Sequence, residues 1–70
     1  MTQIYVPLLD EGTDVWRPAS AEHIRDDFYR ITGETPEDET WKFSRGQVVR
    51  CRQQVLSGAT CLVAYESATI

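Results

Sequence analysis

The chain has 70 residues, of which 41% are hydrophobic and 26% charged. This composition is typical of one folded domain, residues 1–70, and the length excludes a second. Eleven acidic against seven basic side chains give a net charge of −4, which disfavours nucleic acid and anionic membranes as partners. No stretch reaches the ~18 apolar residues of a membrane span, and the first residues lack the basic start of a secretory signal. A cytoplasmic protein is therefore expected.

Alternating apolar and polar residues predict two strands in the first third of the chain. Residues 3–9 show this alternation and end at a turn rich in acids and glycine. Residues 14–24 form the second predicted strand, with Val15, Ala19 and Ala21 on its core side. Small inward residues suit a strand that bends around a narrow barrel.

The remaining chain predicts three more strands and one turn of a different kind. Residues 28–32 are aromatic and β-branched, which favours a short strand. Residues 34–40 combine a threonine, a proline and acids in the order that starts a helix, so one short helical or 3₁₀ turn is expected there. Residues 47–55 and 60–66 form a predicted hairpin.

The turn of this hairpin leaves two registers open. A two-residue turn would place the apolar side chains of the second strand on the arginine-bearing face of the first. A three-residue loop, with Gly58 in the left-handed region, would instead align apolar with apolar side chains. Because the second register gives one apolar and one polar face, we predict the three-residue loop.

Five short strands with turn signals about every ten residues predict an all-β fold, a small antiparallel barrel. Residues 39–51, ETWKFSRGQVVRC, resemble the diverging-turn segment of SH3-like barrels, where an acid precedes a phenylalanine, two residues and a glycine. This resemblance implies an SH3-like barrel of about five strands in which Phe43 plugs the barrel end. The chain lacks the Ala-Leu-Tyr-Asp-Tyr opening and the tryptophan pair of SH3 domains, so the resemblance does not extend to proline-rich peptide binding.

A longer set of segments is similar to short bacterial proteins of unknown function. These segments are VPLLDEGTDVWRP, PEDETWKF and the G-x-V-V-R-C stretch at residues 46–51. The similarity implies a stand-alone bacterial protein and suggests no activity.

The side chains that catalyse reactions or bind metals are few. Cys51 and Cys61 are the two cysteines and His23 is the one histidine, too few and too widely spaced for a zinc site. No nucleophile elbow or glycine-rich phosphate loop is present. We therefore expect free thiols, no metal, no cofactor, no small-molecule substrate and no enzymatic activity.

A protein-interaction module is the main functional hypothesis, and Trp16 is its centre. Trp16 lies opposite the core side of its strand and is expected to be partly exposed; the competing interpretation is that it caps an open barrel end. The predicted partner-binding surface consists of Tyr5, Trp16, Trp41, Glu37, Asp38 and Glu39. Its acids favour a basic or proline-containing protein segment, and the same surface would suit a homodimer.

The alternative hypothesis is nucleic-acid binding through the predicted hairpin. Arg45, Arg50 and Arg52 concentrate positive charge there, and such a stripe could contact phosphate or an acidic protein segment, with tyrosine or tryptophan rings as stacking platforms. Arg50 and Arg52 also fit the solvent face of an alternating strand, paired with acids such as Glu66. The net negative charge favours this second interpretation.

Overall fold

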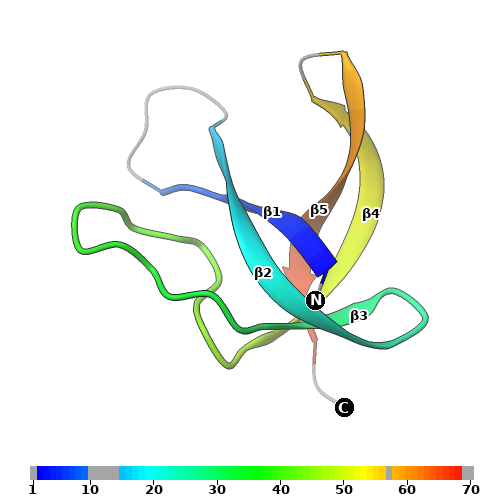
Figure 1. The fold of residues 1–70 in the computed structure, drawn as a ribbon, viewed down its shortest axis with the longest axis horizontal. Helices are drawn as coiled ribbons and strands as arrows, with labels where there is room; N and C mark the ends of the chain where they lie inside the picture. Colours follow the sequence, from blue (N-terminus) through cyan, green and yellow to red (C-terminus); the bar gives the residue numbers. More distant parts are fainter. Residues whose placement is uncertain (1, 10–14, 57, 69–70) are drawn as a thin grey trace.

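The computed structural model describes residues 2–9, 15–56 and 58–68, which form five β-strands (Figure 1). The strands are β1 (Thr2–Pro7), β2 (Trp16–Arg25), β3 (Phe28–Ile31), β4 (Val48–Leu56) and β5 (Ala59–Ser67). At residues 34–40, where a helical or 3₁₀ turn is predicted, the structure has a hydrogen-bonded turn and no helical residue: the Glu39 N–H donates to the Pro36 carbonyl at 3.1 Å. The described ranges contain no helix with the length and hydrophobicity needed to cross a membrane.

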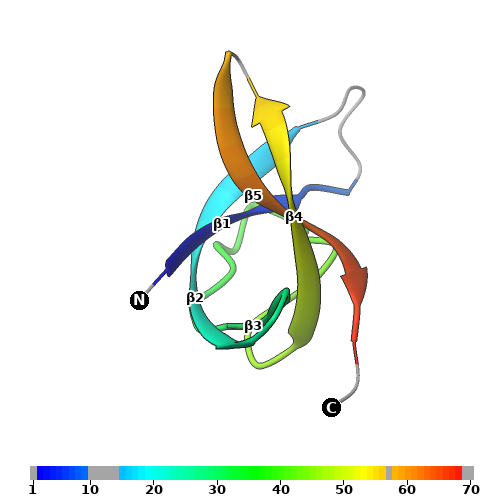
Figure 2. The ribbon, with the colours of Figure 1, turned by 90° about the vertical axis from the view of Figure 1, so that its right-hand side faces the viewer.

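The five strands close into a ring. Each strand is antiparallel to the next one along the chain, and β5 returns to β1 through a parallel contact between Val63 and Tyr5. Turning the molecule shows this ring end-on, with β1 on one side and β4 on the other (Figure 2). The prediction of an all-β, five-stranded, barrel-like fold is confirmed, with a parallel contact at the closure.

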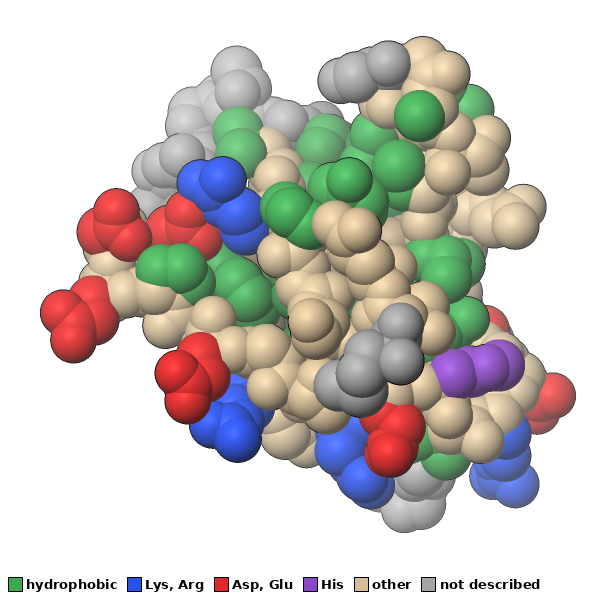
Figure 3. Space-filling model, in the orientation of Figure 1, with side chains coloured by type: hydrophobic (Ala, Val, Ile, Leu, Met, Phe, Trp, Pro, Cys, Tyr) green, Lys and Arg blue, Asp and Glu red, His purple; other side chains and the backbone are tan. Residues whose placement is uncertain are grey.

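The β4–β5 hairpin extends beyond the ring as an arm, which we define as residues 52–56 and 59–62. β3 pairs with β4 no further than Arg50, and β1 pairs with β5 at Val63. Over the described residues, the two strands of the arm therefore pair with each other alone. Hydrophobic side chains gather between the arm and the far end of the β1–β2 hairpin (Figure 3).

The predicted register of the β4–β5 hairpin is wrong. Leu56 pairs with Ala59, so the connection has two residues, and Arg52 lies opposite Val63. Nearer the ring, a bulge shifts the register by one residue and leaves Tyr65 without a pairing partner. The prediction assumed one register throughout, whereas a bulge allows apolar residues to occupy both faces of β5.

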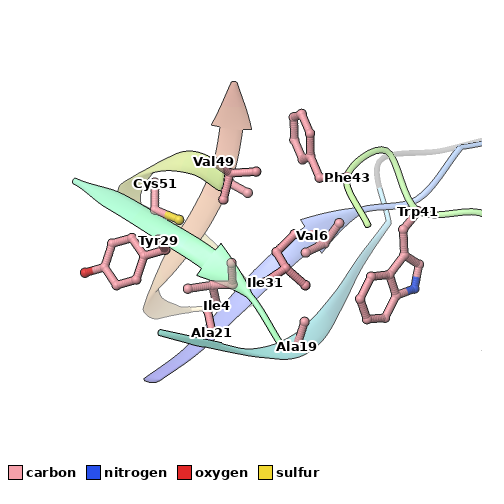
Figure 4. Close-up of a cluster of buried hydrophobic side chains, with 11 residues drawn as sticks. Ile4, Val6, Ala19, Ala21, Tyr29, Ile31, Trp41, Phe43, Val49 and Cys51 are labelled. Carbon is pink, nitrogen blue, oxygen red and sulfur yellow. The ribbon is translucent and has the colours of Figure 1, made fainter. Parts of the chain in front are cut away.

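The core lies inside the ring and is mainly aliphatic. Its buried members are Ile4, Val6, Ala19, Ala21, Tyr29, Ile31, Trp41, Phe43, Val49, Cys51 and Ala64. Tyr29 lies at one end of the cluster, and Phe43 and Trp41 lie at the other (Figure 4). The predicted inward positions Ala19 and Ala21 are confirmed, and Val15 is half-buried. Their small side chains leave room for the larger residues of neighbouring strands.

Candidate binding groove

A groove of about 340 Å³ lies between the outer face of the β1–β2 hairpin and the arm. It is lined by Pro7, Trp16, Lys42, Arg52, Gln54, Val63, Ala64 and Tyr65. β1 and β5 meet at the pair of Tyr5 and Val63 and diverge beyond it, toward the end of the arm, and the groove lies where they diverge.

Trp16 reaches the groove because side chains alternate along β2. Ala19 and Ala21 point into the core, so Trp16 points outward, where it is half-exposed and lies opposite Pro7. The predicted partial exposure of Trp16 is confirmed. The tryptophan buried at the end of the core is Trp41, so the barrel-end role considered for Trp16 belongs to Trp41.

One edge of the arm faces the groove without a strand beside it. Beyond Tyr5, β1 leaves β5 and pairs with residues 40–42: the Lys42 N–H donates to the Pro7 carbonyl at 2.9 Å, and the Leu9 N–H to the Thr40 carbonyl at 2.8 Å. Consequently residues 59–62 of β5 have no strand partner on this side within the described chain. Such an edge offers backbone donors and acceptors to an added strand.

The groove collects basic side chains that are not used in ion pairs. Four arginines form ion pairs with described acids. Arg17 pairs with Glu39. The nitrogen–oxygen distances of the other pairs are 3.5 Å for Arg30 and Glu22, 2.8 Å for Arg45 and Glu34, 3.1 Å for Arg50 and Asp27, and 3.4 Å for Arg50 and Glu66. Arg25, Lys42 and Arg52 form no ion pair with the acids that the structure describes. Two of these three, Lys42 and Arg52, line the groove. The described walls of the groove therefore carry two positive charges in an acidic protein.

The predicted surface is only partly assembled by the fold. Tyr5 is half-buried on the same outer face as Trp16, opposite Pro18. Glu37 and Asp38 are exposed in the β3–β4 connection and do not line the groove. Acidic side chains lie over that connection, on the left of the space-filling view (Figure 3).

The assignment of Trp41 and Glu39 to an exposed surface is wrong. Trp41 is only 8% exposed, and its indole N–H donates to Glu39 Oε1 at 3.0 Å. The other carboxylate oxygen of Glu39 pairs with Arg17. The hydrogen bond from Trp41, and then the contact with Arg17, lower the pKa of Glu39 against the opposing effect of burial. These groups bind one another and close the barrel end.

The three arginines of the alternative hypothesis do not form one stripe. Arg45 pairs with Glu34 in the β3–β4 connection, away from the hairpin face. The hydrogen bond and charge of Asp27 raise the pKa of Arg50, and Glu66 adds to the effect. Arg52 alone of the three lines the groove. The prediction that a solvent-facing Arg50 pairs with Glu66 is confirmed.

The two cysteines and the histidine do not line the groove. Both cysteines are free thiols, and burial, with a smaller effect of Asp27, raises the pKa of Cys51 to about 12. The His23 ring stacks on Tyr29 with centroids 4.5 Å apart, and its Nε2 lies 2.7 Å from the Asp26 carbonyl oxygen. Within the described ranges, no three potential metal ligands come together.

Comparisons with known proteins do not assign the chain to a family. No protein-family model matches the chain, and no curated protein or solved structure matches it either. A functional assignment therefore depends on the chemistry of the groove.

Proposed function

We propose that the protein is a non-enzymatic interaction module that binds an extended segment of a partner protein in the groove. One observation carries the proposal: the half-exposed Trp16 lies in a groove beside the unpaired edge of β5. An extended segment matches both features, since its backbone pairs with a strand edge while its side chains contact aromatic rings. On the resemblance of residues 39–51, we further propose an SH3-like barrel acting in the bacterial cytoplasm.

The residues lining the groove support binding rather than catalysis. Trp16 and Tyr65 provide large ring surfaces, and Pro7 and Val63 add apolar contacts. Aromatic side chains of this kind often dominate the energy of protein interfaces. None of the described lining residues is a carboxylate, a histidine or a cysteine, and these are the side chains that most often serve as general base or activated nucleophile.

A peptide selection combined with a matched pair of variants tests the proposal. Peptides selected on the immobilised full chain are titrated into it, and isothermal titration calorimetry measures binding, so that the readout does not depend on Trp16. We expect Trp16→Ala to weaken binding by roughly 30-fold, the effect of losing a hot spot of ~2 kcal/mol. The control is Val55→Ala: Val55 is 67% exposed on the arm and does not line the groove.

Amide chemical shifts then locate the bound peptide independently of the variants. The proposal predicts changes at the Trp16 indole and along residues 59–62 of the β5 edge. Equal losses in the Val55 and Trp16 variants, or shift changes confined to the opposite face, would show that the groove is not the binding surface.

The second candidate, binding of single-stranded nucleic acid, is supported by a line of rings and guanidinium groups. The Arg50 guanidinium carbon lies 5.8 Å from the centroids of Phe28 and Tyr65, and that of Arg52 lies 4.9 Å from Tyr65. Bases stack on such platforms. This candidate ranks second because Asp27 and Glu66 already neutralise Arg50. It predicts oligonucleotide affinity that falls steeply with salt and with Arg52→Ala.

Self-association through the same β5 edge is the third candidate. Unpaired strand edges join readily across two copies of a chain. Light scattering during size-exclusion chromatography measures the mass directly. A dimer that dissociates on dilution, with tryptophan emission shifting to longer wavelength, would identify the groove as a contact between copies.

A further inference from the structure

We infer that the segment bound in the groove is acidic, carrying aspartate or glutamate side chains together with apolar ones. This inference rests on the proposed function and specifies the chemistry of the partner. It reverses the basic segment expected from the sequence, because the acids on which that expectation depended lie outside the groove.

The first argument comes from the distribution of charge. Acids outnumber bases by eleven to seven, yet three of the seven basic side chains form no ion pair with the described acids. Lys42 and Arg52 are two such side chains among the described residues, and both line the groove. Among the residues that the structure describes, no acid lines the groove. An incoming carboxylate would therefore find the positive charges of Lys42 and Arg52 on the described walls.

The second argument is that the fold holds both basic residues in place. The Arg52 guanidinium carbon lies 4.9 Å from the centroid of the Tyr65 ring, and a guanidinium in such a cation–π contact can still donate its N–H groups to a carboxylate. Lys42 comes from a different wall, where its backbone N–H is bonded to Pro7 and its ammonium group lies 5.7 Å from the Phe43 ring. Two basic groups from separate elements suit an elongated ligand with more than one acid.

The third argument is the geometry of an extended ligand. Successive side chains of a strand point to opposite sides. A segment added along residues 59–62 of β5 would turn every second side chain toward the face of the arm that carries Val63 and Arg52, which are cross-strand neighbours. On that face Val63 favours an apolar side chain and Arg52 favours a carboxylate, so a suitable segment carries both kinds.

Two synthetic peptides test this chemistry. Both are about six residues long, the usual length of a strand; one alternates valine with glutamate, and the other alternates valine with lysine. Each is titrated into the full chain at low salt and followed by tryptophan emission and amide shifts. We expect the glutamate peptide to bind about tenfold more tightly, since exposed charge pairs contribute ~0.2–1 kcal/mol each and like charges repel. Added salt should reduce this preference.

Two charge reversals provide the matched comparison. Arg52→Glu removes a groove charge and should abolish or reverse the preference for the glutamate peptide. Arg45→Glu changes the net charge equally at an exposed position in the β3–β4 connection and should leave the preference unchanged. Loss of the preference in both variants would show that net charge determines it, which would overturn the inference.

The remaining outcomes separate the inference from the proposed function. If the lysine peptide binds equally well or better, with shift changes at Trp16 and the β5 edge, the acidic partner is wrong and the groove still binds peptides. If neither peptide binds, or both bind elsewhere, the inference and the groove proposal both fail. Binding of oligothymidylate through Arg52, with no binding of either peptide, would favour nucleic acid and overturn the inference.

Discussion

A thiol reagent applied to the native protein is expected to distinguish the two cysteines by their surroundings. Cys51 is 3% exposed in the core, and its pKa is raised from 9.0 to about 12. The thiolate is the reacting form. At about pH 8, roughly one in ten ordinary thiols is ionised, against roughly one in ten thousand for Cys51, so its reaction is slowed about 1000-fold before steric protection is counted.

Dithionitrobenzoate measures both thiols by absorbance, in the native protein and in urea. We expect one thiol, the partly exposed Cys61, to react in the native state, and the second to react only on unfolding. Cys51→Ala should remove the slow reaction and Cys61→Ser the fast one. If Cys51 in the Cys61→Ser protein reacts within a few-fold of its rate in urea, the burial and the raised pKa of Cys51 are both wrong.

Three further predictions concern stability. Folding keeps Cys51 protonated between its ordinary pKa of 9.0 and about 12, so the free energy of unfolding should fall by about 1 kcal/mol between pH ~9 and ~10. Urea titrations at several pH values measure this fall, which should be smaller in Cys51→Ala. Folding lowers the pKa of Glu39 through its bond from Trp41, so ionised Glu39 stabilises the fold above its ordinary pKa of 4.5, and that contribution is lost as pH falls through the lowered pKa. Glu39→Gln should therefore melt at a lower temperature at neutral pH and show a smaller acid effect, and an unchanged acid profile would argue against the Glu39 contacts. Gly46 has a φ of +87° and open space around a Cβ position, so Gly46→Ala should lower the urea midpoint through backbone strain alone, by about 1 kcal/mol; an unchanged midpoint would contradict this.

The strands could be predicted because they depend on local alternation. Ile4 and Val6 on β1, and Ala19 and Ala21 on β2, are buried at every second position as the sequence indicates. The register of β4 and β5 could not be predicted in the same way. A bulge at Tyr65 changes the alternation partway along the strand, and periodicity alone does not indicate where a bulge lies.

The two tryptophans show why the site was only partly predictable. Trp16 and Trp41 both stand beside charged residues in the sequence, yet one lines the groove and the other is buried. The difference arises from pairing between distant segments: Leu8 pairs with Trp41 and draws its indole into the barrel end. The same pairing brings Lys42 to the groove wall, and no short-range pattern contains that information.

The closure of the ring by the pair of Tyr5 and Val63 also affects how the chain folds. The hairpins β2–β3 and β4–β5 join neighbouring residues, so their formation costs little chain entropy. The closing pair joins residues from nearly opposite ends of the sequence, so we expect it to form last. During synthesis β1 leaves the ribosome before β5, the strand that completes its ring. Until β5 is free of the ribosome, the β5-facing edge of β1 has no strand to pair with, so the ring stays open.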